Sequence, residues 1–315
     1  MRGVISLLLV SASVAMAAAV SQAPSTAPVM PLERSERVDG IAKSAAGEAL
    51  IKFKDQKLLE SQIAVSVIDL RDSDAAKIGS FRGGERIYPA SVVKLFYLEA
   101  AHRWMEDHKL ADSAELRGKM REMIVNSSNT ATGWVLDAIT QATSGAELPE
   151  EQMKVWANKR NAINRHFAAL GYQNINVNQK TWEETPYGRD KQFLVGNRNA
   201  LTTDATARLM AEIATGRAVT PERSRQMMAL LKRDRPTTRR ADDQASDFAS
   251  RALEDGDKLW SKAGWTSETR HDAIYVETHD GMKVVIVVFT LNHATEREII
   301  PAVVGAVLRQ MRNSS

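Results

Sequence analysis

The 315-residue chain contains no cysteine, which excludes disulfides, thiolate metal sites and a lipid anchor attached to cysteine. Its six histidines show no His-x-x-x-His pair or similar metal-ligand spacing. We therefore predict no metal and no cofactor, and expect the histidines to be solvated or to cap helices. Without cross-links, the fold must be held by its apolar core.

An excess of charge of either sign is also lacking. The 42 basic and 39 acidic residues give a formal charge of +3, and both signs are scattered along the chain. This pattern argues against nucleic acid or an anionic membrane surface as a partner. The 43% of hydrophobic residues are enough for a sizeable core, in one domain or two closely packed ones.

Long apolar runs are missing as well, so no membrane span is predicted. Residues 1–19 contain Arg2, the short apolar run Val4–Val10 and then small residues, the order typical of a secretory signal peptide. Cleavage is expected after Ala17, Ala19 or Ala23. We expect the mature protein to be periplasmic or secreted, and monomeric.

The hydrophobic periodicity places strands near both chain ends and helices between them. Strands are predicted at 63–70, 77–81, 258–264, 272–277 and 282–290, and terminal helices at 38–60 and 295–312. The middle is helical from Pro89 to about Leu231, interrupted by a long loop over 171–200; a loop of that length is usually functional. Residues 232–251 are polar and are expected to form a surface connection.

This order predicts an α+β fold, in which an antiparallel sheet is built from both chain ends and flanked by the terminal helices. An all-α domain is inserted between the two halves of the sheet. The predicted divisions are a signal peptide (1–19), a flexible lead-in (20–36), an α/β domain (37–87 plus 252–315) and the inserted helical domain (88–251).

A candidate nucleophile follows Pro89, which suits the first turn of a helix. Ser91 and Lys94 form a Ser-x-x-Lys sequence, and on a helix these two positions share a face. The helix N-terminus favours developing negative charge, and a buried lysine can take the proton of the serine hydroxyl. A helix start with a solvated lysine would have the same sequence, so the motif alone does not decide between them.

Two further elements add polar groups. Ser127 and Asn129 stand between helical stretches; the hydroxyl can pass a proton to a leaving amine and the amide can bind a substrate carbonyl, although such a run would also serve as a helix N-cap. Lys262 and Gly264 end a predicted strand. The lysine supplies positive charge, and the glycine allows a substrate backbone to come close.

The three elements in this order resemble those of class A β-lactamases and penicillin-binding proteins. The resemblance covers Pro89–Ala131 and Leu259–Phe289, and the order of helices and strands matches over nearly all of the mature chain. It implies that Ser91 is the acylated serine and that Lys94 activates it. It also implies catalytic and binding roles for Ser127, Asn129, Lys262 and Gly264.

The resemblance extends to residues outside the three motifs. The backbone N–H groups of Ser91 and Trp265 would form an oxyanion hole, and Arg270 is similar to an arginine that holds the substrate carboxylate. Trp182-Glu183 resembles the Trp-Glu pair that activates the deacylating water, with Glu184 as an alternative register.

The chain also departs from the family pattern. Ser128 replaces the aspartate of Ser-Asp-Asn, and Ala263 replaces the hydroxyl residue of Lys-Thr-Gly. The family's asparagine four residues after the glutamate is replaced by Tyr187. The interval between Ser91 and Ser127 is shorter than in resistance enzymes of the family. The interval between Ser127 and Lys262 is longer than usual, and the extra residues are expected in 141–165.

These features predict an exported serine hydrolase that acts through an acyl-enzyme on a small molecule, a β-lactam or related amide. A D-alanyl-D-alanine peptidase or an amidase or esterase on the same fold is the alternative. A relative that binds ligand without turnover is a third possibility, which the Ser91–Lys94 pair disfavours.

Overall fold

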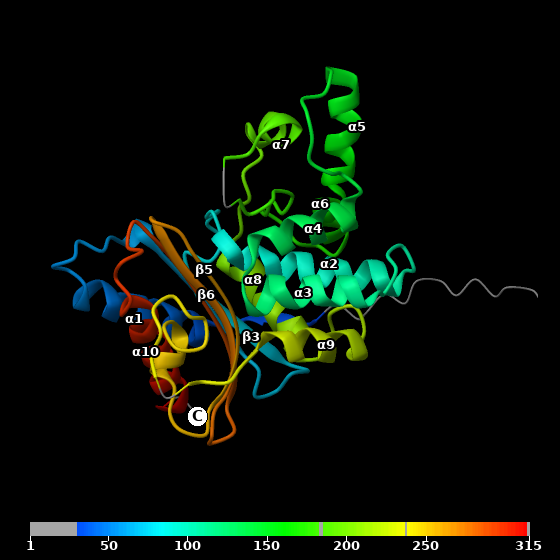
Figure 1. The fold of residues 1–315 in the computed structure, drawn as a ribbon. Helices are drawn as coiled ribbons and strands as arrows, with labels where there is room; N and C mark the ends of the chain where they lie inside the picture. The colour runs from blue at the N-terminus through cyan, green and yellow to red at the C-terminus, as the bar shows by residue number, and fades with distance from the viewer. Residues whose placement is uncertain (1–29, 183–184, 237, 314–315) are drawn as a thin grey trace, which may run out of the picture.

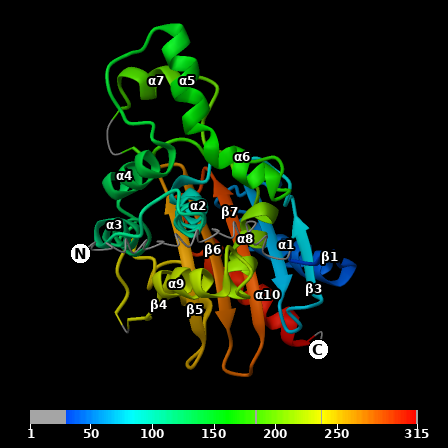
Figure 2. The same ribbon diagram turned by 90° about the vertical axis from the view of Figure 1, so that its right-hand side faces the viewer.

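The computed structural model describes residues 30–182, 185–236 and 238–313, so the predicted signal peptide lies outside it. A single twisted sheet lies between two helical layers (Figures 1 and 2). Helices α1 (Glu36–Lys52) and α10 (Ile299–Asn313), from the two ends of the described chain, cover one face of the sheet. Helices α2 to α9 lie on the other side, and the arrangement confirms the predicted α+β fold.

Seven strands form the sheet, in the order β1-β3-β2-β7-β6-β5-β4 within the described chain. They are β1 (Leu32–Arg34), β2 (Ile63–Asp69), β3 (Ala76–Phe81), β4 (Lys232–Arg233), β5 (Lys258–Trp265), β6 (Thr269–Glu277) and β7 (Lys283–Leu291). Neighbours are antiparallel except β1 and β3. The pairing of β2 with β7 joins the two halves of the sequence, as predicted. Strand β1 lies within 20–36, the segment that was expected to be a flexible lead-in. That prediction is wrong for the residues of β1.

The helical side consists of α2 to α9. Their bounds are α2 (Lys94–Glu106), α3 (Ala114–Val125), α4 (Asn129–Thr140), α5 (Glu150–Arg160), α6 (Ala162–Ala169), α7 (Gly188–Leu194), α8 (Thr203–Ala214) and α9 (Pro221–Leu231). Side-chain hydroxyls of Ser113, Ser128, Thr202 and Thr220 cap four of these helices. Helices α5 and α7 project from the body (Figure 1), and α5 lies in the segment where extra length was expected.

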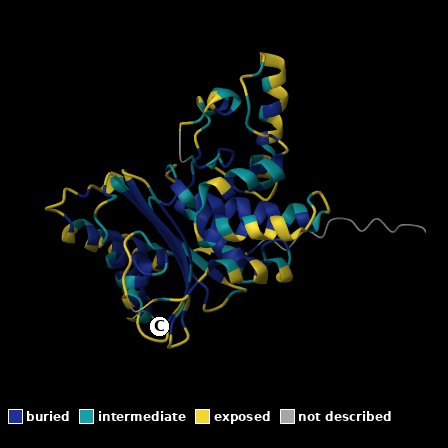
Figure 3. Cartoon of the chain, in the orientation of Figure 1, coloured by how far each residue is buried: buried dark blue, intermediate teal, exposed yellow. Residues whose placement is uncertain are grey.

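Two apolar clusters fill the spaces on either side of the sheet, and the strands between them are buried (Figure 3). Ala273 and Tyr275 of β6 belong to the cluster shared with the inserted helices. Ile274 and Val276 belong to the cluster shared with α1 and α10. This alternation follows from the two-residue period of a strand, and it decides which side chains of β5 and β6 can reach the helical domain.

The connection from β4 to β5 differs from its prediction. Residues 232–251 were expected to be a surface segment, but Phe248 and Ala249 are fully buried against β5 and β6. Gln244 and Asp247 are buried polar residues in the same segment. Burial was missed because charged neighbours hide a short apolar stretch in the local pattern.

Candidate active site

Ser91 lies in the short 3₁₀ helix η2 (Ala90–Val93), which leads directly into α2. Ala90 has φ 47°, in the left-handed region that disfavours residues with a Cβ. Such a conformation costs about 1–3 kcal/mol and persists only where the surroundings enforce it. Ser91 is partly exposed at this strained turn, whereas Lys94 at the start of α2 is fully buried.

The Lys94 side chain reaches the loop between α3 and α4. Its Nζ donates to the Ser127 carbonyl oxygen at 2.5 Å, to Asn129 Oδ1 at 2.8 Å and to Ser127 Oγ at 3.3 Å. Ser127 also has a left-handed backbone, with φ 55°. The structure therefore brings the first two predicted elements together around Lys94.

Lys262 approaches the same hydroxyl from β5. Its Nζ donates to Ser127 Oγ at 3.0 Å, to Ala263 O at 2.8 Å and to Gln244 Oε1 at 2.6 Å. Burial, aided by the nearby positive charges of Lys94 and Arg233, holds the pKa of Lys262 well below its usual value. The Ser127 hydroxyl thus lies between two lysine amines, an arrangement suited to moving a proton.

Gly264 is needed where β5 passes the Ser91 turn. A Cβ at this position would lie 2.8 Å from both Pro89 O and Ser91 N, closer than real Cβ contacts allow. The glycine therefore lets the strand pack directly against the backbone of the nucleophile turn.

The backbone N–H of Trp265 points to the edge of β5 that is not paired with β6. Thr266 N donates to Thr269 O at 2.9 Å, so the next pair, Trp265 and Arg270, is a non-hydrogen-bonded pair of the antiparallel ladder. The N–H and C=O groups of Trp265 therefore point away from β6. The N–H of Ala263, two residues earlier, points the same way and donates to Gln244. This geometry suits an oxyanion hole made by Ser91 N and Trp265 N.

Arg270 does not lie where the resemblance implied. Its cross-strand partner is Trp265, so its side chain lies on the same sheet face as that of Trp265. This is the face opposite to the one on which Gly264 approaches the Ser91 turn. The guanidinium donates to Asp242 Oδ1 and to Asp247 Oδ2, both at 2.9 Å, and its residue is only 2% exposed. The prediction that Arg270 holds a substrate carboxylate is corrected for this reason: two carboxylates of the chain already occupy it.

Glu183 and Glu184 lie outside the described residues. The preceding Trp182 is close to the site, because Asn129 Nδ2 donates to Trp182 O at 3.4 Å. A pocket of about 530 Å³ opens beside Asn129 and is lined by Trp134, Asp137 and the segment Lys180–Trp182, among others. The loop predicted to be functional thus forms one wall of a cavity next to the candidate site.

His271 is a site residue that the sequence analysis missed. Thr290 N donates to its Nδ1 at 3.1 Å, so Nε2 carries the proton and donates to Tyr88 O at 2.9 Å. Burial lowers the pKa of His271 to about 4, which keeps the ring neutral. The histidine holds the turn before Ser91 through this bond, contrary to the expectation that the histidines are solvated or cap helices. Its position opposite Gly264 becomes visible only once β5 and β6 are paired.

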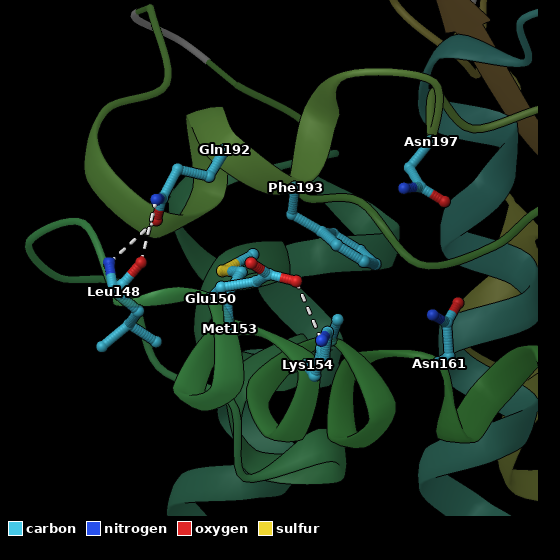
Figure 4. Close-up of a pocket in the computed structure, with 9 residues that line it drawn as sticks. Leu148, Glu150, Met153, Lys154, Asn161, Gln192, Phe193 and Asn197 are labelled. Carbon is cyan, nitrogen blue, oxygen red and sulfur yellow. Dashed lines mark hydrogen bonds and ion pairs between the residues drawn. The ribbon is translucent and has the colours of Figure 1, made fainter.

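Other features of the described chain give no competing site. No cluster of three or more potential metal ligands occurs among the described residues. A second pocket of about 530 Å³ lies between α5 and α7, where the Gln192 amide bonds both main-chain groups of Leu148 (Figure 4). It contains none of the predicted site residues. Within the described part of the chain, no helix has the length and apolar character to cross a membrane.

Comparison with protein families matches residues 105–310, more than half of the chain, to the model described as the beta-lactamase enzyme family. The chain belongs to the beta-lactamase enzyme family. The match begins after Ser91 and Lys94, so the geometry of the nucleophile turn is evidence independent of it. Comparison with curated proteins found no match.

Solved structures of beta-lactamases and of PBP-A share the fold. PBP-A has a TM-score of 0.62 at 16% identity, covering 90% of this chain and 99% of its own. A beta-lactamase from Sphaerobacter thermophilus has a TM-score of 0.63 at 18% identity, covering 86% and 98%. One from Chitinophaga pinensis has a TM-score of 0.62 at 14% identity, covering 87% and 99%. The family membership makes the protein a beta-lactamase-like hydrolase of small-molecule substrates.

Proposed function

We propose that the protein is an acyl-serine hydrolase in which Ser91 attacks a β-lactam or a related amide. The observation that carries the proposal is the Ser127 hydroxyl, within 3.3 Å of Lys94 Nζ and 3.0 Å of Lys262 Nζ, beside the Ser91 turn. A structure of a PBP-A variant as an acyl-enzyme complex with penicillin G supports this chemistry on the shared fold.

In the proposed reaction, the neutral amine form of Lys94 takes the proton of Ser91 as Oγ attacks the substrate carbonyl. The N–H groups of Ser91 and Trp265 then stabilise the oxyanion, and each such donor is commonly worth about 3 kcal/mol. Ser127 passes the proton to the leaving nitrogen as the amide bond breaks. Asn129, whose amide already bonds Lys94 and Trp182, orients the substrate carbonyl with its second N–H.

The experiment is hydrolysis of a penicillin by the mature protein and by Ser91→Ala, with circular dichroism to verify the fold. We expect Ser91→Ala to lose hydrolysis entirely while remaining folded. Hydrolysis that continues in the folded variant would contradict the proposal.

We further propose that Glu183 activates the deacylating water. Glu183→Gln should then accumulate the acyl-enzyme, whereas Glu184→Gln should turn over at nearly the parent rate. Release from Glu183→Gln as fast as from the parent would refute this assignment.

A D-alanyl-D-alanine peptidase on the same scaffold is the second candidate. The replacement of the family's asparagine by Tyr187 favours it, because looser positioning of the deacylating water would slow release of the acyl group. This candidate predicts that the parent itself retains the penicillin adduct for many minutes and cleaves an acyl-D-alanyl-D-alanine peptide.

A further inference from the structure

Gln244 joins the two halves of the candidate site from a segment that the sequence analysis did not connect with it. It lies between β4 and β5 in sequence and is 5% exposed. Its Oε1 accepts hydrogen bonds from Lys262 Nζ at 2.6 Å and from Ala263 N at 3.1 Å. Its Nε2 donates to Ile124 O at 3.2 Å and to Val125 O at 3.1 Å.

The chemistry of the partners fixes the orientation of this amide. An ammonium and a peptide N–H both require an acceptor, and two carbonyls both require a donor. Only a neutral carboxamide satisfies all four. A carboxylate could not donate to the carbonyls of Ile124 and Val125, of which Ile124 O keeps a second donor in Arg233 Nη2 at 3.2 Å. An apolar side chain would remove all four bonds.

These bonds connect the two segments that carry the reacting groups, the Ser127 loop after α3 and strand β5. Val125 ends α3, and the strained residue Ser127 follows two positions later. Ala263 N and Trp265 N point to the same edge of β5, so the bond to Gln244 holds the strand next to the proposed oxyanion donor. Gln244 therefore ties the Ser127 loop to the strand that carries Lys262.

We infer that Gln244 is a positioning residue for acylation, which holds the Lys262 ammonium against Ser127 and fixes the Ser127 loop to β5. This inference rests on the proposed acyl-serine function. It assigns to the connection between β4 and β5 a role in the reaction that the family match does not specify.

The charges around Lys262 make this role measurable. Lys94 from α2 and Arg233 from β4 oppose its ammonium form, and Asp272 from β6 favours it. The three acceptors on Nζ are Ser127 Oγ, Ala263 O and Gln244 Oε1. Removing one acceptor destabilises the charged amine and lowers its pKa, whereas a carboxylate in place of the amide raises it. Acylation that requires charged Lys262 should therefore fall with rising pH at a position set by residue 244.

The test compares acylation rates of the mature protein, Gln244→Met and Gln244→Glu with a penicillin between pH 5 and 10. Gln244→Met keeps the length of the side chain but removes every hydrogen bond. We expect its acylation rate to fall about tenfold to a hundredfold, the scale of small positioning errors. The alkaline limb of its pH–rate profile, where acylation falls with rising pH, should move to lower pH. In Gln244→Glu the limb should move to higher pH.

Gln192→Met is the matched control. Gln192 also bonds main-chain groups through its amide, at Leu148 N and Leu148 O, but lies in the α5–α7 pocket (Figure 4). This variant should lose stability without a change in acylation rate or in its pH profile. Opposite shifts of the limb in the two Gln244 variants are not expected from a loss of stability, and Gln244→Glu remains informative if Gln244→Met does not fold.

The outcomes separate the two proposals. If the parent is not acylated at Ser91, the proposed function fails. If the parent is acylated but both Gln244 variants keep its rate and its alkaline limb, the role of Gln244 is wrong. Faster acylation of Gln244→Met would also overturn it, because Gln244 would then obstruct Lys262 and not position it.

Discussion

At the scale of single residues, the site depends on groups that are held in costly states. Ala90 and Ser127 adopt left-handed backbone conformations, and Lys94 and Lys262 are amines with no exposed surface. Burying a charge costs free energy unless it is paired or hydrogen-bonded. The shared hydroxyl of Ser127 and the surrounding oxygen acceptors supply those bonds, so the same contacts support both stability and chemistry.

Lys94→Arg tests the proton transfer. An arginine keeps the positive charge but cannot release a proton near pH 7, so it cannot act as a base. We expect acylation by a penicillin to fall by at least about a hundredfold, the usual scale of general-base catalysis. Lys258→Arg, at an exposed position on β5, is the matched control and should keep the parent rate. Parent-like acylation by folded Lys94→Arg would remove this lysine from the mechanism.

Gly264→Ala tests the close approach of β5 to the nucleophile turn. The added methyl would lie 2.8 Å from Ser91 N and must displace either the strand or the turn. We expect at least about a hundredfold loss of acylation rate, because shifts of about 1 Å in reacting groups have effects of this size. Gly118→Ala, on α3 with no atom within 4 Å of the added Cβ, should leave the rate unchanged. Equal rates in both variants would show that the contact is unimportant.

At the scale of elements, β6 separates functional from structural side chains by the alternation of its two faces. His271 points to the helical domain and braces Tyr88, whereas Arg270 and Asp272 point to the side of α1 and α10. The sequence pattern predicted this strand only over 272–277, which excluded Arg270 and His271, and did not give its register with β5. The role given to Arg270 was therefore wrong, and the role of His271 was not recognised.

Asp272 gives a prediction for the pH dependence of stability. It is fully buried, Oδ2 accepts a hydrogen bond from Ala249 N at 3.1 Å, and burial raises its pKa from 3.8 to about 6. A raised folded-state pKa stabilises the fold below pH 3.8, and this contribution is lost as the pH rises through about 6. The two pKa values imply a loss of about 3 kcal/mol.

Asp272→Asn keeps the acceptor for Ala249 N but cannot ionise. Relative to the parent, its free energy of unfolding should therefore rise between pH 4 and pH 7. Urea unfolding of both proteins across this range measures the difference. Parallel curves for parent and variant would show that Asp272 does not titrate in this window.

At the scale of the whole molecule, the chain order predicted more than the local patterns did. Strand segments at both ends and helices between them predicted one sheet built from both chain ends, and the pairing of β2 with β7 joins them. The Ser-x-x-Lys, Ser-x-Asn and Lys-x-Gly elements meet around Ser127. The role of Gln244 could not be predicted, because nothing in its neighbouring residues indicates which buried groups the polar segment between β4 and β5 will contact.

Export is a further proposal at this scale, motivated by Arg2, the run Val4–Val10 and the small residues that follow. N-terminal sequencing of the protein recovered from a bacterial host should give a chain that begins between Ala18 and Pro24. Recovery of only the full-length chain from the cytoplasm would contradict it.

The most direct test of the account is a time course of intact mass after mixing the mature protein with a penicillin. Ser113→Ala, which removes only the cap of α3, is the matched control, and Ser91→Ala removes the nucleophile. We predict one adduct per chain, located on the peptide that contains Ser91, which appears and then decays in the parent and in Ser113→Ala and never forms in Ser91→Ala. Penicillin hydrolysis with no adduct at any time, or an adduct of equal yield in Ser91→Ala, would contradict the central claim that Ser91 is the acylated nucleophile.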